Sequence, residues 1–161
     1  MPDPTRPVAG APIDTDWGQQ IHDRVFQPKG VRAHQASGGS STVGTTYEQL
    51  GIDTADDDPG GWLSSDALTV PTGAGGLYVF FLRIGADGSD DEYARVELRV
   101  NGTGYVDPRF SLETGQIQYP INGIIELSAG DILTIWGRAS ASTFLRVLQA
   151  DLVIIGTSIG A

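Results

Sequence analysis

The chain has no cysteine, one methionine and two histidines among its 161 residues. Without cysteine it can form no disulfide, no thiolate nucleophile and no cysteine-based zinc site. Histidine is the usual base near neutral pH, so His22 and His34 are the candidates for such a role. Neither belongs to a triad arrangement that the sequence can show, and we interpret both as surface or interface residues.

Basic residues and long apolar runs are also scarce. Ten basic residues stand against twenty acidic ones, and the formal net charge is -10. This charge repels a phosphate backbone, so we expect no nucleic-acid partner. No apolar run approaches the roughly 18 residues of a membrane span, and residues 1–10 lack the apolar core of a secretion signal. We therefore expect a protein that stays in the cytosol or leaves a cell by another route, such as inside a particle released by lysis.

Glycine and proline, in contrast, are plentiful, with 22 and 9 copies. This composition is typical of an all-β domain with many tight turns. Strand-like segments recur about every ten residues, which predicts roughly eight to ten strands and no helix after residue 27. The pattern indicates an antiparallel β-sandwich or jelly roll over residues 31–161. The expected strands are 31–36, 45–50, 68–70, 77–84, 93–100, 105–112, 117–119, 124–127, 132–139 and 144–155.

The strongest strand signals are residues 77–84 (LYVFFLRI) and 93–100 (YARVELRV). The second alternates apolar and charged residues, as a half-buried strand does. The turn-formers between them predict an antiparallel hairpin. The first is apolar on both sides and needs cover on two faces, for which we expect a symmetric copy of the chain or, alternatively, loops such as residues 51–61. The candidates for contact with a second copy are Tyr78, Phe80, Leu82 and Ile84.

Two dipeptides and the last strand give finer predictions. Asn101-Gly102 is a strong turn signal, and Asn122-Gly123 is a second turn or bulge. The last strand, residues 144–155, is expected to alternate without interruption, which would place Leu145 and Asp151 on one face.

Residues 1–30 differ from the rest and are predicted to form an N-terminal arm. Residues 1–12 hold four of the nine prolines, which favours an extended segment. Asp14 or Thr15 can cap a short helix over residues 15–26. The helix has an apolar stripe, for which we expect docking on partner chains or, alternatively, packing on the chain's own domain. The stripe consists of Trp17, Ile21, Val25 and Phe26.

Two acidic loops, residues 53–58 and 87–92, are the only candidate metal sites. Neither has the spacing of a known calcium loop, and we interpret both as solvated turns. Their carboxylates lie in turns instead of the paired arrangement that a glycosidase needs. Residues 156–160 match the GxSxG pattern, but no helix, aspartate and histidine follow. We therefore expect no catalytic residue, no cofactor, no metal and no enzymatic activity.

Four motifs together resemble the tumour-necrosis-factor-like and complement globular-head jelly rolls. They are VPTGAGGLYVFF (residues 70–81), RVELRVNGT (95–103), LSAGDILTIWGRA (127–139) and ADLVIIGT (150–157). The resemblance covers about residues 31–157 with the motifs in the same order. It implies a jelly roll that forms a tight homotrimer about a three-fold axis, with the arms bundled at one end.

The leader PTRPVAGAPIDTDWGQQIHDRVF (residues 4–26) resembles that of small virion proteins of tailed bacteriophages, of the minor tail or head-fibre type. This resemblance implies a structural virion protein, assembled in the host cytoplasm and released by lysis. The arm would anchor a homotrimeric jelly-roll module to other virion proteins, in the tail or fibre apparatus. The alternative is a trimer that decorates the capsid or forms a head fibre.

Aromatic residues near the loops suggest an additional role in host attachment. Trp62 and Tyr105 are the candidates for contact with a host-surface glycan, because aromatic faces stack on sugars. The alternative is that these rings fill the ends of the sandwich.

Overall fold

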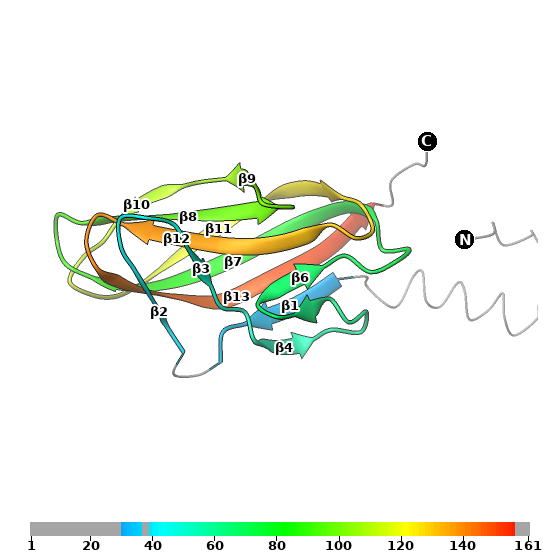
Figure 1. The fold of residues 1–161 in the computed structure, drawn as a ribbon, viewed down its shortest axis with the longest axis horizontal. Coiled ribbons are helices and arrows are strands. Elements are labelled where there is room, and N and C mark those ends of the chain that lie inside the picture. The colour runs from blue at the N-terminus through cyan, green and yellow to red at the C-terminus, as the bar shows by residue number, and fades with distance from the viewer. Residues whose placement is uncertain (1–29, 37–38, 157–161) are drawn as a thin grey trace, which may run out of the picture.

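The structure is a computed structural model and describes residues 30–36 and 39–156. These residues form thirteen strands in two antiparallel sheets, which pack face to face (Figure 1). No helix long and apolar enough to cross a membrane occurs in this described part of the chain. The predicted all-β sandwich is therefore confirmed.

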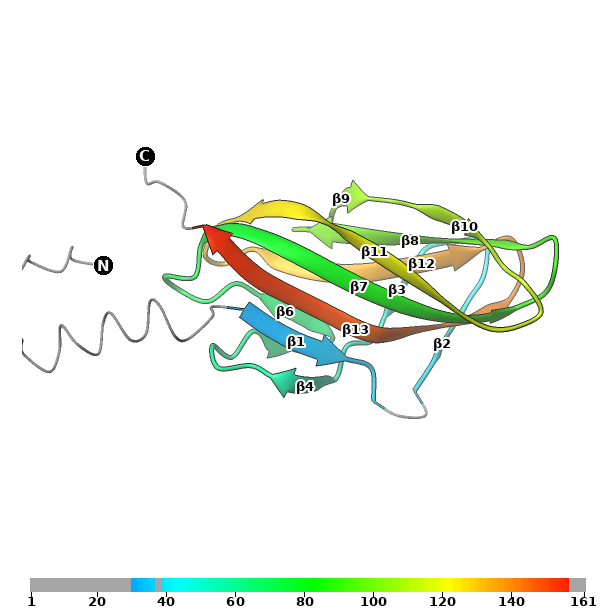
Figure 2. The ribbon, with the colours of Figure 1, turned by 180° about the vertical axis from the view of Figure 1, so that it is seen from behind.

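The first sheet has six strands, in the order β11-β7-β13-β1-β4, with β2 also paired to β13. Its long strands β7 and β13 lie side by side (Figure 2). The strands of this six-stranded sheet are β1 (Gly30–His34), β2 (Ser41–Val43), β4 (Thr54–Asp57), β7 (Gly76–Gly88), β11 (Gly115–Leu127) and β13 (Thr143–Gly156).

The second sheet has seven strands, in the order β10-β8-β12-β6-β5, with β3 also paired to β12 and β9 to β8. The strands of this seven-stranded sheet are β3 (Glu48–Leu50), β5 (Leu63–Ser64), β6 (Ala67–Thr69), β8 (Tyr93–Val100), β9 (Thr103–Val106), β10 (Arg109–Ser111) and β12 (Ile132–Ala139).

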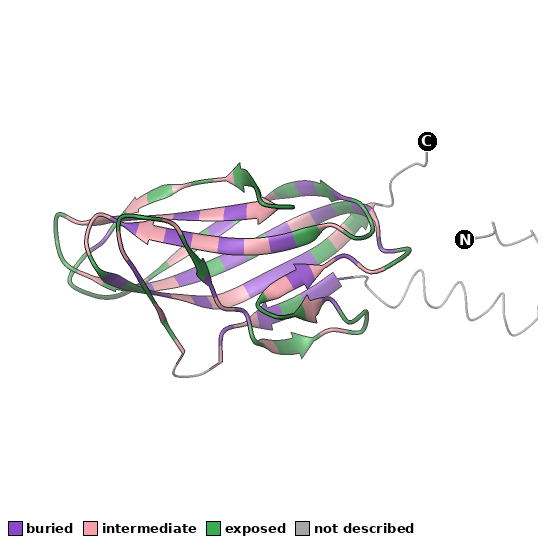
Figure 3. Cartoon of the chain, in the orientation of Figure 1, coloured by how far each residue is buried: buried purple, intermediate pink, exposed green. Residues whose placement is uncertain are grey.

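The core lies between the sheets and follows from the two-residue period of the strands. Buried residues alternate with more exposed ones along β7, β8 and β12 (Figure 3). Phe80 from one sheet and Leu98 and Ile135 from the other are buried in this core. Burial of apolar surface, at about 25 cal/mol per Å², is the main force that holds the two sheets together.

The predicted hairpin between residues 77–84 and 93–100 is wrong. β7 pairs with β11 and β13, whereas β8 pairs with β9, β10 and β12, so the two strands belong to different sheets. The connecting residues cross from one sheet to the other, with Asp91 in the left-handed region at φ 70°. The turn-forming composition indicates that the chain reverses, but it does not say which sheet receives the next strand.

Asn122-Gly123 is also not a turn, because both residues lie within the continuous strand β11. A Cβ atom on Gly123 would lie 2.8 Å from the ring of Phe80, its cross-strand partner. The glycine is therefore needed for the close approach of an aromatic ring. By contrast, Asn101-Gly102 is confirmed as a turn, since it links β8 to β9 with φ values of 51° and 79°.

The last strand does not alternate without interruption. The register of β13 against β7 shifts between Val147 and Gln149, which is the mark of a β-bulge. Leu145 is buried on one side of the shift and Leu152 on the other. Asp151 therefore lies on the face opposite to Leu145, contrary to the prediction.

The number of strands exceeds the predicted eight to ten, because β2, β4 and β5 are not among the expected strands and one expected strand is divided, although β11 joins the expected strands 117–119 and 124–127. The acidic stretch at residues 51–61 contains the strand β4. The expected strand 105–112 is divided into β9 and β10 at residues 107–108, where a proline lacks the N–H that strand pairing requires.

Candidate functional site: the outward face of the six-stranded sheet

The four residues predicted to contact a second copy lie on the inward side of β7. This choice is wrong, because all four are at most 5% exposed within the single chain. The outward side of the strand instead presents Leu77, Val79 and Phe81. Both sides of the strand are apolar, so the sequence does not show which one faces the core. The four buried residues are Tyr78, Phe80, Leu82 and Ile84.

The outward face of this sheet has a continuous apolar surface. Val79 is the cross-strand partner of Ile124 on one side and of Val153 on the other. Of the eight large hydrophobic residues that are exposed in the described part of the chain, six lie on this sheet. Large apolar surfaces of this kind mark interaction sites. The apolar patch, as we call it, consists of Leu77, Phe81, Ile124, Val153 and Ile155.

Tyr105 on β9 lies next to the apolar patch. Its hydroxyl donates to the carbonyl of Ile124 at 2.7 Å, and its ring meets Phe80 edge-on with centroids 6.3 Å apart. The ring is half exposed. The predicted ligand-contact residue Tyr105 thus presents a partly exposed aromatic ring beside β11, at the edge of the six-stranded sheet.

Trp62, the other predicted ligand-contact residue, is only 1% exposed. Its ring packs edge-on against Tyr78, with centroids 5.5 Å apart. The prediction of ligand contact is wrong for Trp62, and the alternative that it fills the sandwich is confirmed. An exposed aromatic that the sequence analysis missed is Phe144, which borders a hollow of about 350 Å³ at the other end of the same face.

A second hollow, of about 370 Å³, lies on the outward face beside Phe81. It is lined partly by polar residues, among them Arg83, Gln149 and Asp151. Asp151 is only 6% exposed. One sequence signal points to it, because it is an isolated acid within the apolar strand FLRVLQADLVII.

Asp151 is only partly satisfied by its own chain. Its Oδ2 accepts from Gln149 Nε2 at 2.6 Å and, at a longer 3.4 Å, from Arg32 Nε. Its Oδ1 is buried and has no hydrogen-bond partner in the part of the chain that the structure describes. A buried carboxylate oxygen without a donor is costly. Beside the apolar patch, this face therefore has a carboxylate oxygen that lacks a hydrogen-bond donor in the described residues.

The outward face of the seven-stranded sheet is built differently. The guanidinium of Arg99 lies 4.3 Å from the ring centroid of Trp136 and 5.4 Å from that of Tyr47, and Arg99 also donates to Glu97 at 2.6 Å. Tyr47 donates to Asp107 at 2.6 Å. Burial and this hydrogen bond raise the pKa of Tyr47 above that of a free tyrosine. On this face, arginine side chains thus form cation–π contacts with aromatic rings of the same chain.

The carboxylates of the acidic loops mainly fix turns. Asp58 accepts from the backbone N–H groups of Trp62 at 2.7 Å and Leu63 at 3.0 Å. Asp90 accepts from the N–H of Thr114 at 2.8 Å. No group of three or more potential metal ligands occurs among residues 30–36 and 39–156.

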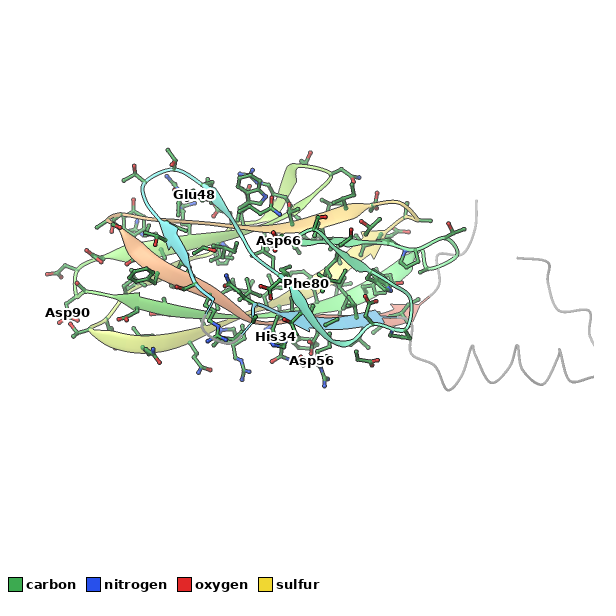
Figure 4. All side chains as sticks on the ribbon, turned by 60° about the horizontal axis from the view of Figure 1, so that its bottom comes forward. His34, Glu48, Asp56, Asp66, Phe80 and Asp90 are labelled. Atoms are coloured by element: carbon green, nitrogen blue, oxygen red, sulfur yellow. The ribbon has the colours of Figure 1, made fainter. Side chains whose placement is uncertain are left out.

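His34 is the last residue of β1, which lies between β13 and the edge strand β4. Its Nδ1 is 3.0 Å from a carboxylate oxygen of Asp56. Figure 4 shows this pair together and Asp90 well apart from it, at the left tip of the sandwich. The two acidic loops therefore do not form one site.

The predictions for the N-terminal arm lie outside the described residues. They concern residues 1–29 of the arm, with His22 and the predicted docking helix, whereas residue 30, the last of the predicted arm, is the first residue of β1. The helix residues are Trp17, Ile21, Val25 and Phe26. Most of the GxSxG match at residues 156–160 also lies outside.

Comparison with known proteins gives matches among solved structures alone. No family model and no curated protein matches the sequence. The structure of Eiger TNF from S. frugiperda matches with a TM-score of 0.63 and 13% identity, covering 83% of this chain and 96% of that one. The globular domain of zebrafish complement 1qA matches with a TM-score of 0.58 and 12% identity, covering 80% and 98%.

Murine APRIL is a third match, with a TM-score of 0.54 and 16% identity, covering 78% of this chain and 100% of that one. At these identities the likeness shows the fold alone. The chain thus has the jelly-roll fold of the tumour necrosis factor and complement 1q type, and this part of the predicted resemblance is confirmed.

Proposed function

We propose that the chain is a homotrimeric structural module that assembles through the outward face of its six-stranded sheet. The observation that supports this proposal most directly is the apolar patch. Water contact with such a surface is unfavourable by about 25 cal/mol per Å², and a second copy removes it. The resemblance drawn from the sequence implies a homotrimer, and the apolar patch supplies a surface through which such a trimer can assemble.

The position of Tyr105 favours a ring over a two-fold dimer. A face that carries the apolar patch and an edge that carries Tyr105 are different surfaces of one chain. When one surface of a copy contacts another surface of the next, the contact is heterologous, and such contacts give a ring where the rotation between copies closes. We propose that the β9 and β11 edge of each copy packs on the apolar patch of its neighbour.

We further propose that this trimer is a structural component of a tailed-bacteriophage virion, assembled in the host cytoplasm and released by lysis. The sequence of residues 4–26 supports this part. Gly30 is the cross-strand partner of Val153 in the apolar patch, so cyclic symmetry would place three arms at the same end of the trimer. Three clustered arms suit anchoring to other virion proteins in a tail or fibre.

The alternative location is the phage head, as a decorating or head-fibre trimer, because the same arms could lie along a shell. The proposed role is structural and not enzymatic. A glycan contact at the half-exposed Tyr105 stays a prediction and is not needed for the assembly.

Light scattering on the purified protein tests the assembly. We expect about three times the 17.0 kDa mass of one chain, both for the full chain and for a version that lacks residues 1–29. A monomer in both would contradict the proposal. A trimer for the full chain alone would move the contact from the sheet to the arm.

The location is tested by gold-labelled antibody against the purified protein, applied to particles from a lysate that contains it. Label on tails or fibres is expected. Label over the heads would favour the alternative, and unlabelled particles would contradict a virion role.

A further inference from the structure

On the same face, Arg83 has no partner and Asp151 has one carboxylate oxygen without a donor within the described residues. Arg83 is exposed on β7 and makes no ion pair, hydrogen bond or ring contact within the described residues. Every other arginine in that part of the chain contacts a carboxylate, a carbonyl or an aromatic ring. Asp151 Oδ1 is likewise without a partner there. An unpaired cation and a carboxylate with one oxygen that lacks a donor thus line one hollow.

We propose that Arg83 of a neighbouring copy enters this hollow and donates to Oδ1 of Asp151. Each contact between copies then contains one Arg83–Asp151 ion pair beside the apolar patch. This inference rests on the proposed homotrimer and assigns to it a pair of residues that sets how the copies meet.

Within one chain Arg83 and Asp151 are diagonal neighbours on adjacent strands, and they form no ion pair or hydrogen bond with each other there. Arg83 stands opposite Gln149, and Asp151 stands opposite Phe81. The amide of Gln149 donates to Asp151 Oδ2 and so takes up one of the two carboxylate oxygens. The weaker contact from Arg32 goes to the same oxygen. Both donors from the chain itself therefore leave Oδ1 unused.

Contact with a second copy makes the missing donor more important. Closing the hollow against another protein surface removes water from the exposed guanidinium of Arg83, and a charged group that is buried without a partner then opposes assembly. A guanidinium can satisfy a carboxylate with two parallel hydrogen bonds. Charge pairs of this kind determine the orientation of partners more than they add affinity.

The first variant is Arg83→Glu, with Arg109→Glu as its matched control. Both arginines are exposed, but Arg109 lies on the other sheet, 3.9 Å from the ring centroid of Tyr93. We expect Arg83→Glu to weaken trimer assembly at least about thirty-fold in dilution-dependent light scattering. Arg109→Glu should change it less than about three-fold. Equal effects of the two variants would overturn the proposal.

The second step separates contact between copies from contact within one. Arg83→Glu chains are mixed with Asp151→Lys chains. In a mixed ring, two of the three contacts join opposite charges, whereas each variant alone has like charges at all three. Recovery of trimer on mixing is the expected result. Without recovery, when both variants are folded by circular dichroism, the pair is not between copies.

Chemical cross-linking does not depend on the folding of a charge-reversed variant. The chain lacks cysteine, so a mixture of Arg83→Cys and Asp151→Cys chains has only these two thiols. A short bis-maleimide should link them into a product that contains one chain of each variant. Absence of this product would contradict the pairing, provided that the wild-type protein is a trimer. A monomeric wild type would instead contradict the proposed function itself.

Discussion

The two outward faces of the sandwich belong to one fold, but their outward side chains differ in the partners that they find within the chain. On the seven-stranded sheet, Arg99 lies over Trp136 and donates to Glu97, although the buried Nε of Arg138 has no hydrogen-bond partner in the described residues. On the six-stranded sheet, Phe81 and Ile124 are exposed, and Asp151 Oδ1 is buried without a donor. We call the first face complete, because each of its arginines contacts a carboxylate or an aromatic ring of the same chain. We call the second face incomplete, because its apolar patch is uncovered and one oxygen of Asp151 has no donor within the described part of the chain.

This difference shows that the fold alone does not decide which sheet is used for assembly. Both sheets bury their inward sides equally well, as Phe80 and Ile135 show with 1% exposure each. The side chains that alternate outward make the difference. Arginines held over aromatic rings suit water, whereas an apolar surface with an unpaired acid suits a second protein surface. Substitutions on the two faces should therefore have different consequences.

The largest effect is expected from placing a charge in the apolar patch. Phe81→Asp would bury an unpaired carboxylate at each contact between copies, which costs about 3–5 kcal/mol. Trimer affinity should fall by roughly a hundred-fold or more. The chain should remain folded, because Phe81 points away from the core. Light scattering across a dilution series measures the affinity, and circular dichroism checks the fold.

Ile132→Asp is the matched control for this prediction. Ile132 lies on the seven-stranded sheet and is 45% exposed, against 46% for Phe81. The same charge there should leave the trimer intact. A loss of trimer with Ile132→Asp, together with normal assembly of Phe81→Asp, would reverse the assignment of the two faces.

The sequence predicts the class of fold better than it predicts which side of each strand faces the core. Strand 132–139 has the predicted limits, because apolar and polar residues alternate along it. Residues 77–84 are apolar on both sides, so their composition shows that two surfaces must be covered but not which surface is internal. The actual contact candidates, such as Phe81, lie one residue away from the predicted ones.

Two other errors have a common physical cause. The turn propensity of Asn122-Gly123 predicts a turn or bulge, although the role of Gly123 is to admit the ring of Phe80 from another strand. Asp151 was assigned to the wrong side, because a bulge two to four residues earlier shifts the register. Close approach and bulges depend on tertiary contacts, which local sequence patterns do not contain.

The second prediction concerns Tyr78 on the inward side of β7, which should affect the stability of the chain and not its assembly. Burial raises the pKa of Tyr78 to about 12, against about 10 in an unfolded chain. Below pH 10 the hydroxyl is protonated in both states, so its contribution to stability is complete. As the pH rises from 10 to 12 the unfolded chain ionises first, and the free energy of unfolding falls by about 1.4 kcal/mol per pH unit.

Urea denaturation at pH 9 to 12, compared between wild type and Tyr78→Phe, measures this effect. The variant should start about 1 kcal/mol lower, since it lacks the hydrogen bond from the hydroxyl to the carbonyl of Ala74. Its stability should then fall less steeply above pH 10. Parallel curves for the two proteins would show that Tyr78 does not ionise differently in the folded chain.

The smallest effect is expected on the complete face. Arg99→Ala removes the stacking on Trp136 and the bond to Glu97, and partly exposed contacts of this kind contribute about 0.5–1 kcal/mol each. The free energy of unfolding should fall by roughly 1 kcal/mol, while the mass in solution stays that of the wild type.

Arg83→Ala on the other face should do the opposite. It should weaken assembly without changing the stability of a chain kept monomeric by Phe81→Asp. If Arg99→Ala also dissociated the trimer, the seven-stranded sheet would take part in assembly, and the contrast between a complete face and an incomplete one would no longer explain how copies of this chain meet.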